Sequence, residues 1–292
     1  MGEKFLTKCR LCNSSLLDII DYENNISRCK SCGYIFNNPY PSFEDIQEYY
    51  SKPTKYAGWM ENINIREKLW RRRLNLVNKF KKPGNILDIG AGIGQFLYLA
   101  KDHFSETCGT EISKSAIETA KDMYSLDIIE GTIESINFSS KKFDNITLFH
   151  VLEHVEEPQA VLKKCNNILT ESGILFIAVP NDVQSIKARL KNLVKIIGGR
   201  NISSTGVYGL SKIMLDGSVD EIHLSHFTTH VLKVTLNREG FKIIDASIDP
   251  YFVSSGFRHL VQNIYFFGHL IILKLFNLNL YDTIWIVAEK EC

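Results

Sequence analysis

The sequence predicts an α/β protein: a doubly wound, mostly parallel sheet of seven strands with a small zinc ribbon at the N-terminus. Three observations carry this prediction. Two C-x-x-C pairs lie within the first 32 residues, short strands and helices alternate from residue 85 onward, and a glycine-rich turn joins the first of these strands to a helix. Such alternation predicts a sheet covered by helices on both faces.

Composition and charge narrow the class of protein. The 292 residues are 45% hydrophobic and 23% charged, which excludes a disordered chain and a disulfide miniprotein. The net charge of +1 gives no overall attraction to nucleic acid, so we expect no DNA partner and consider RNA a minor alternative. The first ten residues contain no apolar segment, so no signal peptide is predicted and we expect a cytoplasmic protein.

Four cysteines at the N-terminus predict a structural zinc site. Cys9 pairs with Cys12 and Cys29 with Cys32, and sixteen residues separate the two pairs. Two such pairs can close a tetrahedral thiolate site, the ligand set that Zn²⁺ prefers. Because four cysteines leave no open coordination position, the metal is expected to stabilise the ribbon and to perform no chemistry.

We expect three parts along the chain. Residues 1–42 form the ribbon, residues 43–82 form a tyrosine-rich helical linker and cap, and residues 83–292 form the main domain, with an inserted lid at 181–222. A helix is predicted within 61–82, and its basic cluster Arg71–Arg73 is expected to face solvent. The expected strands of the main domain are 85–89, 106–111, 126–130, 143–149, 173–179, 241–248 and 281–288, and its expected helices are 94–103, 114–123, 158–169 and 229–239.

The glycine turn predicts a nucleoside site. The spacing Gly90-x-Gly92-x-Gly94 differs from that of a dinucleotide loop, whose third glycine would fall at Gln95. Asp88 would repel a pyrophosphate at the strand end, whereas it would attract a cationic ligand. Glu111 ends the next strand, where a carboxylate can accept both ribose hydroxyls. These features favour an adenosine that carries a sulfonium and an amino group.

At this point the chain resembles the class I S-adenosylmethionine (SAM)-dependent methyltransferases over residues 60–250. Asp88 and the three loop glycines match the first motif of the family, and Glu111 matches its ribose-binding acid. The resemblance also implies adenine contacts near Thr132 and Ile133, and places His150 beside the methionine end of the cofactor. The predicted cofactor-binding residues are therefore Asp88, Gly90, Ala91, Gly92, Gly94, Gln95, Glu111, Ile112, Thr132, Ile133 and His150.

Two groups of ionisable residues compete for the catalytic role. The first comprises His150, Glu153 and His154; it is similar to a stretch that carries two carboxylates and a histidine, suited to a divalent metal, in quinone-type O-methyltransferases. The second group is Glu221, His223 and His226, in a segment similar to that of zinc-ribbon sugar methyltransferases. We predict His223 as the general base, with His154 or His226 as rivals and Glu221 as its acidic neighbour.

The acceptor is predicted to be a small molecule, with a sugar, nucleotide sugar or glycan precursor hydroxyl as the first class. The alternatives are a quinone-type acceptor, ribosomal RNA gripped by the ribbon, or a non-catalytic module that only binds the cofactor. The apolar stretch 257–280 is too polar for a spanning helix and is expected to pack on the core or in an oligomer interface. Peripheral contact with a membrane or a lipid-linked substrate is the alternative for this stretch.

Overall fold

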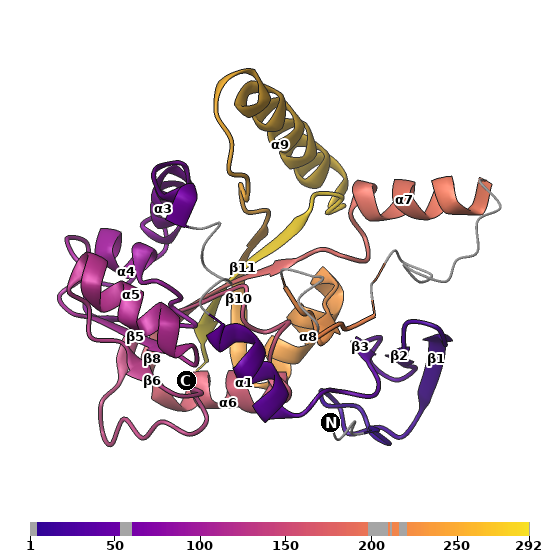
Figure 1. Cartoon of the computed structure of the whole chain (residues 1–292), viewed down its shortest axis with the longest axis horizontal. Helices are drawn as coiled ribbons and strands as arrows, with labels where there is room; N and C mark the ends of the chain where they lie inside the picture. The colour runs from indigo at the N-terminus through magenta and orange to yellow at the C-terminus, as the bar shows by residue number, and fades with distance from the viewer. Residues whose placement is uncertain (1–4, 53–59, 198–209, 211, 216–220, 292) are drawn as a thin grey trace.

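The computed structural model describes residues 5–52, 60–197, 210, 212–215 and 221–291. Its centre is the expected seven-stranded sheet, with the strand order β10-β11-β8-β7-β4-β5-β6 (Figure 1). Six strands run parallel, and β11 is antiparallel to both of its neighbours. The strands are β4 (Ile86–Ile89), β5 (Thr107–Glu111), β6 (Ile129–Glu130), β7 (Phe143–Phe149), β8 (Leu169–Pro180), β10 (Phe241–Ser247) and β11 (Thr283–Lys290).

The order of the strands determines where a ligand can bind. The chain runs outward from β4 through β5 to β6, and then returns to the other side of β4 with β7. Strand order therefore reverses between β4 and β7, and a crevice opens beyond the carboxyl ends of strands at such a switch point. The glycine turn follows β4 directly and lies at this crevice.

Successive side chains of the central strands point to opposite faces of the sheet, and in these strands both sets are largely apolar and buried. Helices therefore cover both faces of the sheet. In β8, Leu175 and Ile177 pack in the core beneath α6 and α8, whereas Phe176 packs in the core beneath α3 and α4. The helices are α1 (Phe43–Ser51), α3 (Ile63–Val77), α4 (Gln95–Ala100), α5 (Lys114–Tyr124), α6 (Pro158–Ile168), α7 (Ile186–Ile197), α8 (Thr229–Arg238) and α9 (Gly256–Phe276).

The N-terminal ribbon is joined to the main domain by a strand from far along the chain. Its sheet contains β1 (Leu17–Asp21), β2 (Ile26–Cys29), β3 (Ile35–Asn37) and also β9 (Ser225–His226). Phe36 pairs with Ser225, and the Tyr34 ring packs against Phe227 at 5.6 Å. The ribbon therefore shares a core with the main domain, so a domain boundary at residue 42 remains a proposal.

The basic cluster on α3 is largely inside the protein, which corrects the solvated face expected for it. Arg73 is fully buried and forms an ion pair with Asp249. The Arg72 guanidinium lies 4.1 Å from the ring centre of Phe252. Of the three, Arg71 fits the expectation, because it pairs with Glu67 one turn earlier on an exposed surface. An arginine inside a core needs a charge partner, and the local sequence around α3 contains no sign of Asp249.

The segment expected as a lid is described only in part. It begins with α7, which projects from the carboxyl edge of the sheet (Figure 1). Residues 198–209, 211 and 216–220 lie outside the described residues, as do Tyr56 and Trp59 of the tyrosine-rich segment. The described end of the lid segment, from Glu221 onward, leads directly into β9.

Candidate active site

The glycine turn brings backbone to the edge of the crevice. Gly90 has a φ of 71°, a left-handed conformation that favours glycine, and a Cβ atom there would lie 2.6 Å from Val151. The N–H groups of Gly90 and Ala91 donate to the Thr110 carbonyl at 2.9 and 3.0 Å. These bonds attach the turn to β5, so that its inner edge stays open toward a ligand.

Two buried carboxylates flank the turn. Asp88 accepts a hydrogen bond from the Thr147 hydroxyl at 2.6 Å, and Glu111 accepts N–H bonds from Gly92, Ile112 and Ser113 at 2.8–2.9 Å. Burial raises the pKa of Asp88 to about 7, and the nearby charge of Glu111 adds to this shift. Burial also raises the pKa of Glu111, although its backbone donors oppose the rise. A ligand with positive charge or hydroxyl donors would compensate for the solvent that both groups have lost.

A cavity of about 1130 Å³ lies above the turn and the two carboxylates. Nine of the predicted cofactor-binding residues line it: Asp88, Gly90, Ala91, Gly92, Glu111, Ile112, Thr132, Ile133 and His150. This volume slightly exceeds the roughly 300–1,000 Å³ of typical small-molecule sites. Backbone close to the ligand, a carboxylate at the end of β5 and apolar groups beyond it fit the chemistry of an adenosine-containing cation.

Gly94 and Gln95 do not line this cavity, in contrast to the prediction. Gly94 precedes α4 in a left-handed conformation, and a Cβ atom there would lie 2.7 Å from Leu126. The Gln95 side chain points away from the cavity and donates to the Ile63 carbonyl at 2.9 Å. The third glycine is therefore needed for close packing between the turn and α5, not for ligand contact.

His150 follows β7 in a left-handed conformation, with φ 59°. Its Nε2 lies 2.8 Å from the guanidinium of Arg73, and its Nδ1 lies 3.2 Å from Glu153. Because a guanidinium only donates, Nε2 is assigned as the acceptor and Nδ1 as the donor to Glu153. Arg73 also donates through Nε to Asp249 at 2.8 Å. The orientation of His150 is thus determined by charged groups on both sides of the ring.

Glu153 connects His150 to a second histidine. It is 1% exposed, and its Oε1 lies 3.8 Å from Nε2 of His154. Burial alone would raise the pKa of Glu153, but the hydrogen bond from His150 and the neighbouring histidine charges outweigh burial and lower it. The sequence placed Glu153 in the first of the two candidate catalytic groups, and the structure identifies it as the buried acid between two histidines.

His154 lies on the cavity wall with its ring oriented by α1 and by the chain before β9. Its Nδ1 is 2.6 Å from the Ile222 carbonyl and 2.9 Å from the Tyr50 hydroxyl. Since a carbonyl only accepts, Nδ1 is assigned the hydrogen, which leaves the lone pair on Nε2. Burial lowers the pKa of His154 below 6.5, with partial opposition from Glu153. This histidine can therefore accept a proton at neutral pH.

The ring of His223 packs against the ring of His154, with 5.1 Å between their centres. His223 is not among the described residues that line the cavity, so it lies on the side of His154 away from the cavity. Its Nδ1 lies 2.8 Å from Asp182, and its Nε2 lies 3.7 Å from Glu221, which does line the cavity. Burial alone would lower the pKa of His223, but the two carboxylates outweigh burial and raise it well above 6.5. The interaction with the His223 cation in turn lowers the pKa of Glu221 to about 2.

His226 belongs to the same buried network but faces the ribbon. Its Nδ1 lies 3.1 Å from Asp182, its Nε2 lies 3.4 Å from the Asn37 amide oxygen, and the residue is 5% exposed. It does not line the cavity. Two histidines therefore share Asp182, a residue that the sequence gave no reason to select beyond its place just after β8.

The cavity wall also contains residues that sequence reasoning missed. Tyr251 packs against His150 with 4.5 Å between ring centres, and the Arg73 guanidinium lies 5.0 Å from the ring centre of Tyr251. Tyr50 was noted only as one of several tyrosines. Aromatic residues, acids and arginines within α1 and α3 were the available signal, but neither helix carries a recognised motif.

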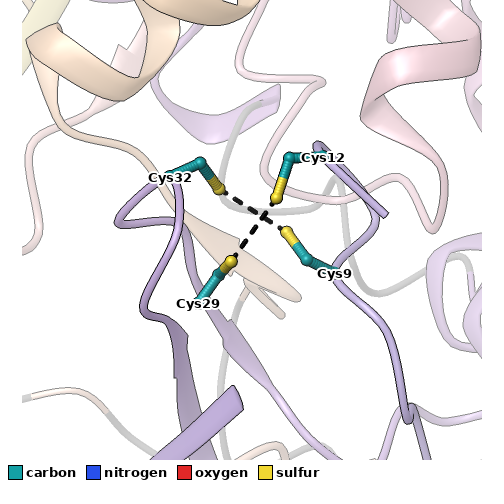
Figure 2. A group of neighbouring side chains, drawn as sticks. All are labelled: Cys9, Cys12, Cys29 and Cys32. Atoms are coloured by element: carbon teal, nitrogen blue, oxygen red, sulfur yellow. Dashed lines mark hydrogen bonds between the residues drawn. The ribbon is translucent and has the colours of Figure 1, made fainter. Parts of the chain in front are cut away.

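The four N-terminal cysteines converge as expected (Figure 2). Their sulfur atoms lie within 4.8 Å of one another, with Cys9 and Cys32 at 3.6 Å and Cys12 and Cys29 at 3.5 Å. Four thiolates about 2.3 Å from a central zinc would lie roughly 3.8 Å apart. The spacing and the all-sulfur donor set therefore fit a structural zinc ion.

Comparisons with known proteins agree with this fold and site. Residues 61–246 match a family model described as "Methyltransferase domain". An uncharacterised protein of Methanocaldococcus jannaschii is 27% identical over 204 residues, 68% of this chain and 77% of that protein. A ubiquinone biosynthesis O-methyltransferase of Coxiella burnetii is 27% identical over 158 residues, 52% of this chain and 64% of that enzyme.

Solved structures show the same fold at low sequence identity. The magnesium protoporphyrin IX methyltransferase of Synechocystis PCC 6803 has a TM-score of 0.53 at 13% identity. The match covers 86% of this chain and 100% of that one. A SAM-dependent methyltransferase of Clostridium acetobutylicum has a TM-score of 0.51 at 12% identity, covering 77% of this chain and 92% of that one. The fold and the cavity define a nucleoside-binding α/β enzyme. The chain belongs to the methyltransferase-domain family and is a SAM-dependent methyltransferase.

Proposed function

We propose that this methyltransferase transfers a methyl group to a hydroxyl of a small polar acceptor, with sugars, nucleotide sugars and glycan precursors as the first class. The single observation that carries the proposal is the cavity, which is continuous from the glycine turn to a wall formed by His154, Glu221 and Tyr251. Aromatic rings can pack on the apolar faces of a sugar, and carboxylates accept its hydroxyl hydrogens.

SAM, when bound, supplies an already activated methyl group, so the chain must position the acceptor, exclude water and remove a proton. The arrangement favours Nε2 of His154 as the proton acceptor. His154 lines the cavity, its Nε2 carries a lone pair, and its pKa is lowered. His223, predicted from the sequence as the base, is favoured instead as a cation that orients Glu221, since its pKa is raised. Glu153 is placed to stabilise His154 once that ring has taken up a proton.

A quinone-type phenol is the second candidate acceptor. Two observations favour it: the relative named as a ubiquinone biosynthesis O-methyltransferase, and the cluster of Glu153, His154 and His223, whose ligand atoms lie within 4.8 Å of one another. A divalent cation held there would polarise the acceptor oxygen. On this alternative, activity would depend on added Mg²⁺ or Mn²⁺ and His154 would be a ligand.

Transfer of labelled methyl from SAM to a panel of acceptors tests the proposal. Labelling of a nucleotide sugar or glycan precursor that persists after treatment with EDTA is the expected result. Labelling of a catechol-type quinone precursor that EDTA abolishes would support the second candidate, and labelling of ribosomal RNA would support the RNA alternative. SAM binding with no transfer to any acceptor would indicate a cofactor-binding module and contradict the proposal.

We also propose that the four cysteines hold one zinc ion that stabilises the ribbon. Metal analysis of the purified chain should give one zinc per chain, and Cys29→Ser should lose it. Cys165→Ser is the matched control, because Cys165 is buried in α6 and distant in sequence from the cluster. Equal zinc content in both variants would contradict the assignment.

A further inference from the structure

Two helical insertions leave the carboxyl edge of the main sheet next to each other and diverge from there (Figure 1). The helix α7 follows the carboxyl end of β8, and α9 connects β10 to β11. Both project from the same side of the molecule (Figure 1). They are adjacent, because the Ile186 N–H donates to the Leu280 carbonyl at 2.8 Å and the Lys187 ammonium lies 5.0 Å from the ring centre of Tyr265.

The polarity of α9 is the reverse of that expected for a surface helix. His269, in the middle of the helix, is 8% exposed and lies against Tyr265 and Tyr281, and Gln262 is partly buried and accepts from the Ser254 hydroxyl. The outward face is apolar, with positions three or four residues apart that are 48–80% exposed: Phe257, Val261, Ile264, Phe267, Ile271 and Leu275. A continuous apolar stripe of this length on a surface indicates a contact with an apolar partner.

The charge of the two insertions differs from that of the remaining chain. Residues 183–215 and 250–281 contain no Asp or Glu, whereas eight of the chain's 34 Lys and Arg residues lie there. The remaining 26 Lys and Arg residues face 33 Asp and Glu elsewhere. Among the described residues, Lys187 pairs with Asp282, whereas Arg189 on α7 and Arg258 and Lys274 on α9 are exposed. Exposed cations beside an apolar stripe favour an anionic lipid surface. Two copies of the chain that met through this surface would bring like charges together.

Among the described residues, α9 is the helix that is long and apolar enough to cross a bilayer, but its connections exclude that arrangement. Both ends return to neighbouring strands, where Ser247 pairs with Trp285. A 21-residue helix is about 31 Å long, similar to the hydrocarbon core. The eight residues 248–255 or the six residues 277–282 would have to cross that distance in non-helical form, and eight residues span at most about 29 Å. Unpaired backbone inside lipid would add a large cost.

We propose that α9, with α7 beside it, forms a docking surface for an anionic membrane, on which α9 lies parallel to the bilayer plane. The apolar stripe enters the boundary between headgroups and acyl chains, and Arg189, Arg258 and Lys274 contact lipid phosphates. Because the insertions leave the carboxyl edge of the sheet, docking brings the edge that carries the cavity close to the lipid. This inference does not depend on which acceptor the enzyme uses.

Vesicle flotation with the full chain tests the proposal. We expect binding to vesicles that mix phosphatidylglycerol with phosphatidylcholine, much weaker binding to pure phosphatidylcholine, and loss of binding at high salt. The double variant Ile264→Asp with Phe267→Asp should bind at least about 10-fold more weakly, since it places charge on the apolar stripe. Met123→Asp is the matched control, because Met123 is an exposed apolar residue on α5.

A charge-reversal variant tests the electrostatic part. Arg189→Glu combined with Arg258→Glu and Lys274→Glu should reduce binding to the anionic vesicles about 10-fold or more, whereas Lys163→Glu on α6 should have little effect. Unchanged SAM affinity shows that each variant is folded. The proposal is overturned if the wild-type chain binds neither kind of vesicle, or if the double variant and the Met123→Asp control bind equally well. It is also overturned if α9 instead mediates a dimer that the double variant Ile264→Asp with Phe267→Asp dissociates.

Discussion

The two ends of the cavity are built from the same residue types in opposite electrostatic environments. At the cofactor end, Asp88 and Glu111 are buried carboxylates with raised pKa values. At the acceptor end, Glu221 lines the cavity and Asp182 lies behind it, and both carboxylates have lowered pKa values. Hydrogen bonds from His223 and His226 to Asp182, and the His223 cation near Glu221, outweigh the effect of burial. At the first end the two carboxylates accept hydrogen bonds from a hydroxyl and from backbone N–H groups, whereas at the second end they face the His223 cation.

This difference follows from function. A site for a sulfonium nucleoside gains affinity when its carboxylates have no cationic partner in the protein. A site that removes a proton needs a base with a defined lone pair, and the ion pairs around His154 hold that ring in one orientation. Four predictions test this comparison, beginning with the largest expected effect.

His154→Gln should lower kcat by about 10²–10⁴-fold, because it removes the proposed proton acceptor. SAM affinity should stay unchanged, since His154 lies at the acceptor end. Steady-state kinetics and calorimetry measure the two effects, with the exposed His230→Gln on α8 as the matched control. His223→Asn should reduce kcat by a smaller factor. A larger loss for His223→Asn than for His154→Gln would restore His223 as the base.

Glu111→Gln should weaken SAM binding by about 10–100-fold. It replaces a carboxylate that accepts three N–H bonds with an amide that turns a donor toward one of them. Calorimetry with SAM measures the change. The control is Glu130→Gln, because Glu130 is the exposed register partner of Glu111 on β6. Equal affinities in the two variants would place the ribose elsewhere.

The pH profile of kcat separates the two histidines by a shift of one or more pH units. A base must lose its proton, so kcat falls as pH drops through the pKa of the base. With His154 as the base, this fall lies below pH 6.5, since burial lowers its pKa. With His223 as the base, kcat would still be rising above pH 6.5. Measurement of kcat between pH 5 and pH 9 at saturating SAM distinguishes the two.

Asp88→Asn should raise the melting temperature of the SAM-free chain by about 2–4 °C at pH 8. A carboxyl group whose folded pKa is raised binds more protons in the folded than in the unfolded state. Wild-type stability therefore falls as pH rises from about 4 toward 7, and the amide avoids this loss. Thermal scans of wild type and variant at pH 5 and pH 8 test the sign. A gain that is larger at pH 5 than at pH 8 would contradict it.

The sequence predicted the main sheet well because its signals are local. Each expected strand of the main domain is present, although the strand expected over 126–130 is reduced to Ile129–Glu130. The helix expected within 61–82 begins at Ile63 and ends at Val77. The cofactor end could be read in the same way, because the glycine turn and Glu111 each lie next to a recognisable strand. The exceptions, Gly94 and Gln95, follow the last residues of the turn that face the cavity.

The acceptor end could be read only in part, because its residues come from distant segments: the sequence proposed His154 and Glu221 but gave no sign that Tyr50 and Tyr251 lie beside them. Tyr50 lies on α1, His154 follows β7, Glu221 precedes β9 and Tyr251 follows β10. Arg73 was misjudged for the same reason, since its partner Asp249 lies 176 residues further along the chain. The pairing of β3 with β9 likewise depends on two segments whose sequences contain no sign of each other.

By itself, the sequence determined the order of strands and helices, the four-cysteine cluster, the glycine turn and the acid that follows the next strand. Hydrophobic periodicity, turn chemistry and ligand spacing act over a few residues, and so they can be read from neighbouring positions. The tertiary structure decided which histidine faces the cavity, which carboxylates are paired and which side of α9 is exposed. Burial and charge pairing depend on groups that only folding brings together. They determine the proton affinity of each histidine and carboxylate, and they determine which face of α9 is exposed.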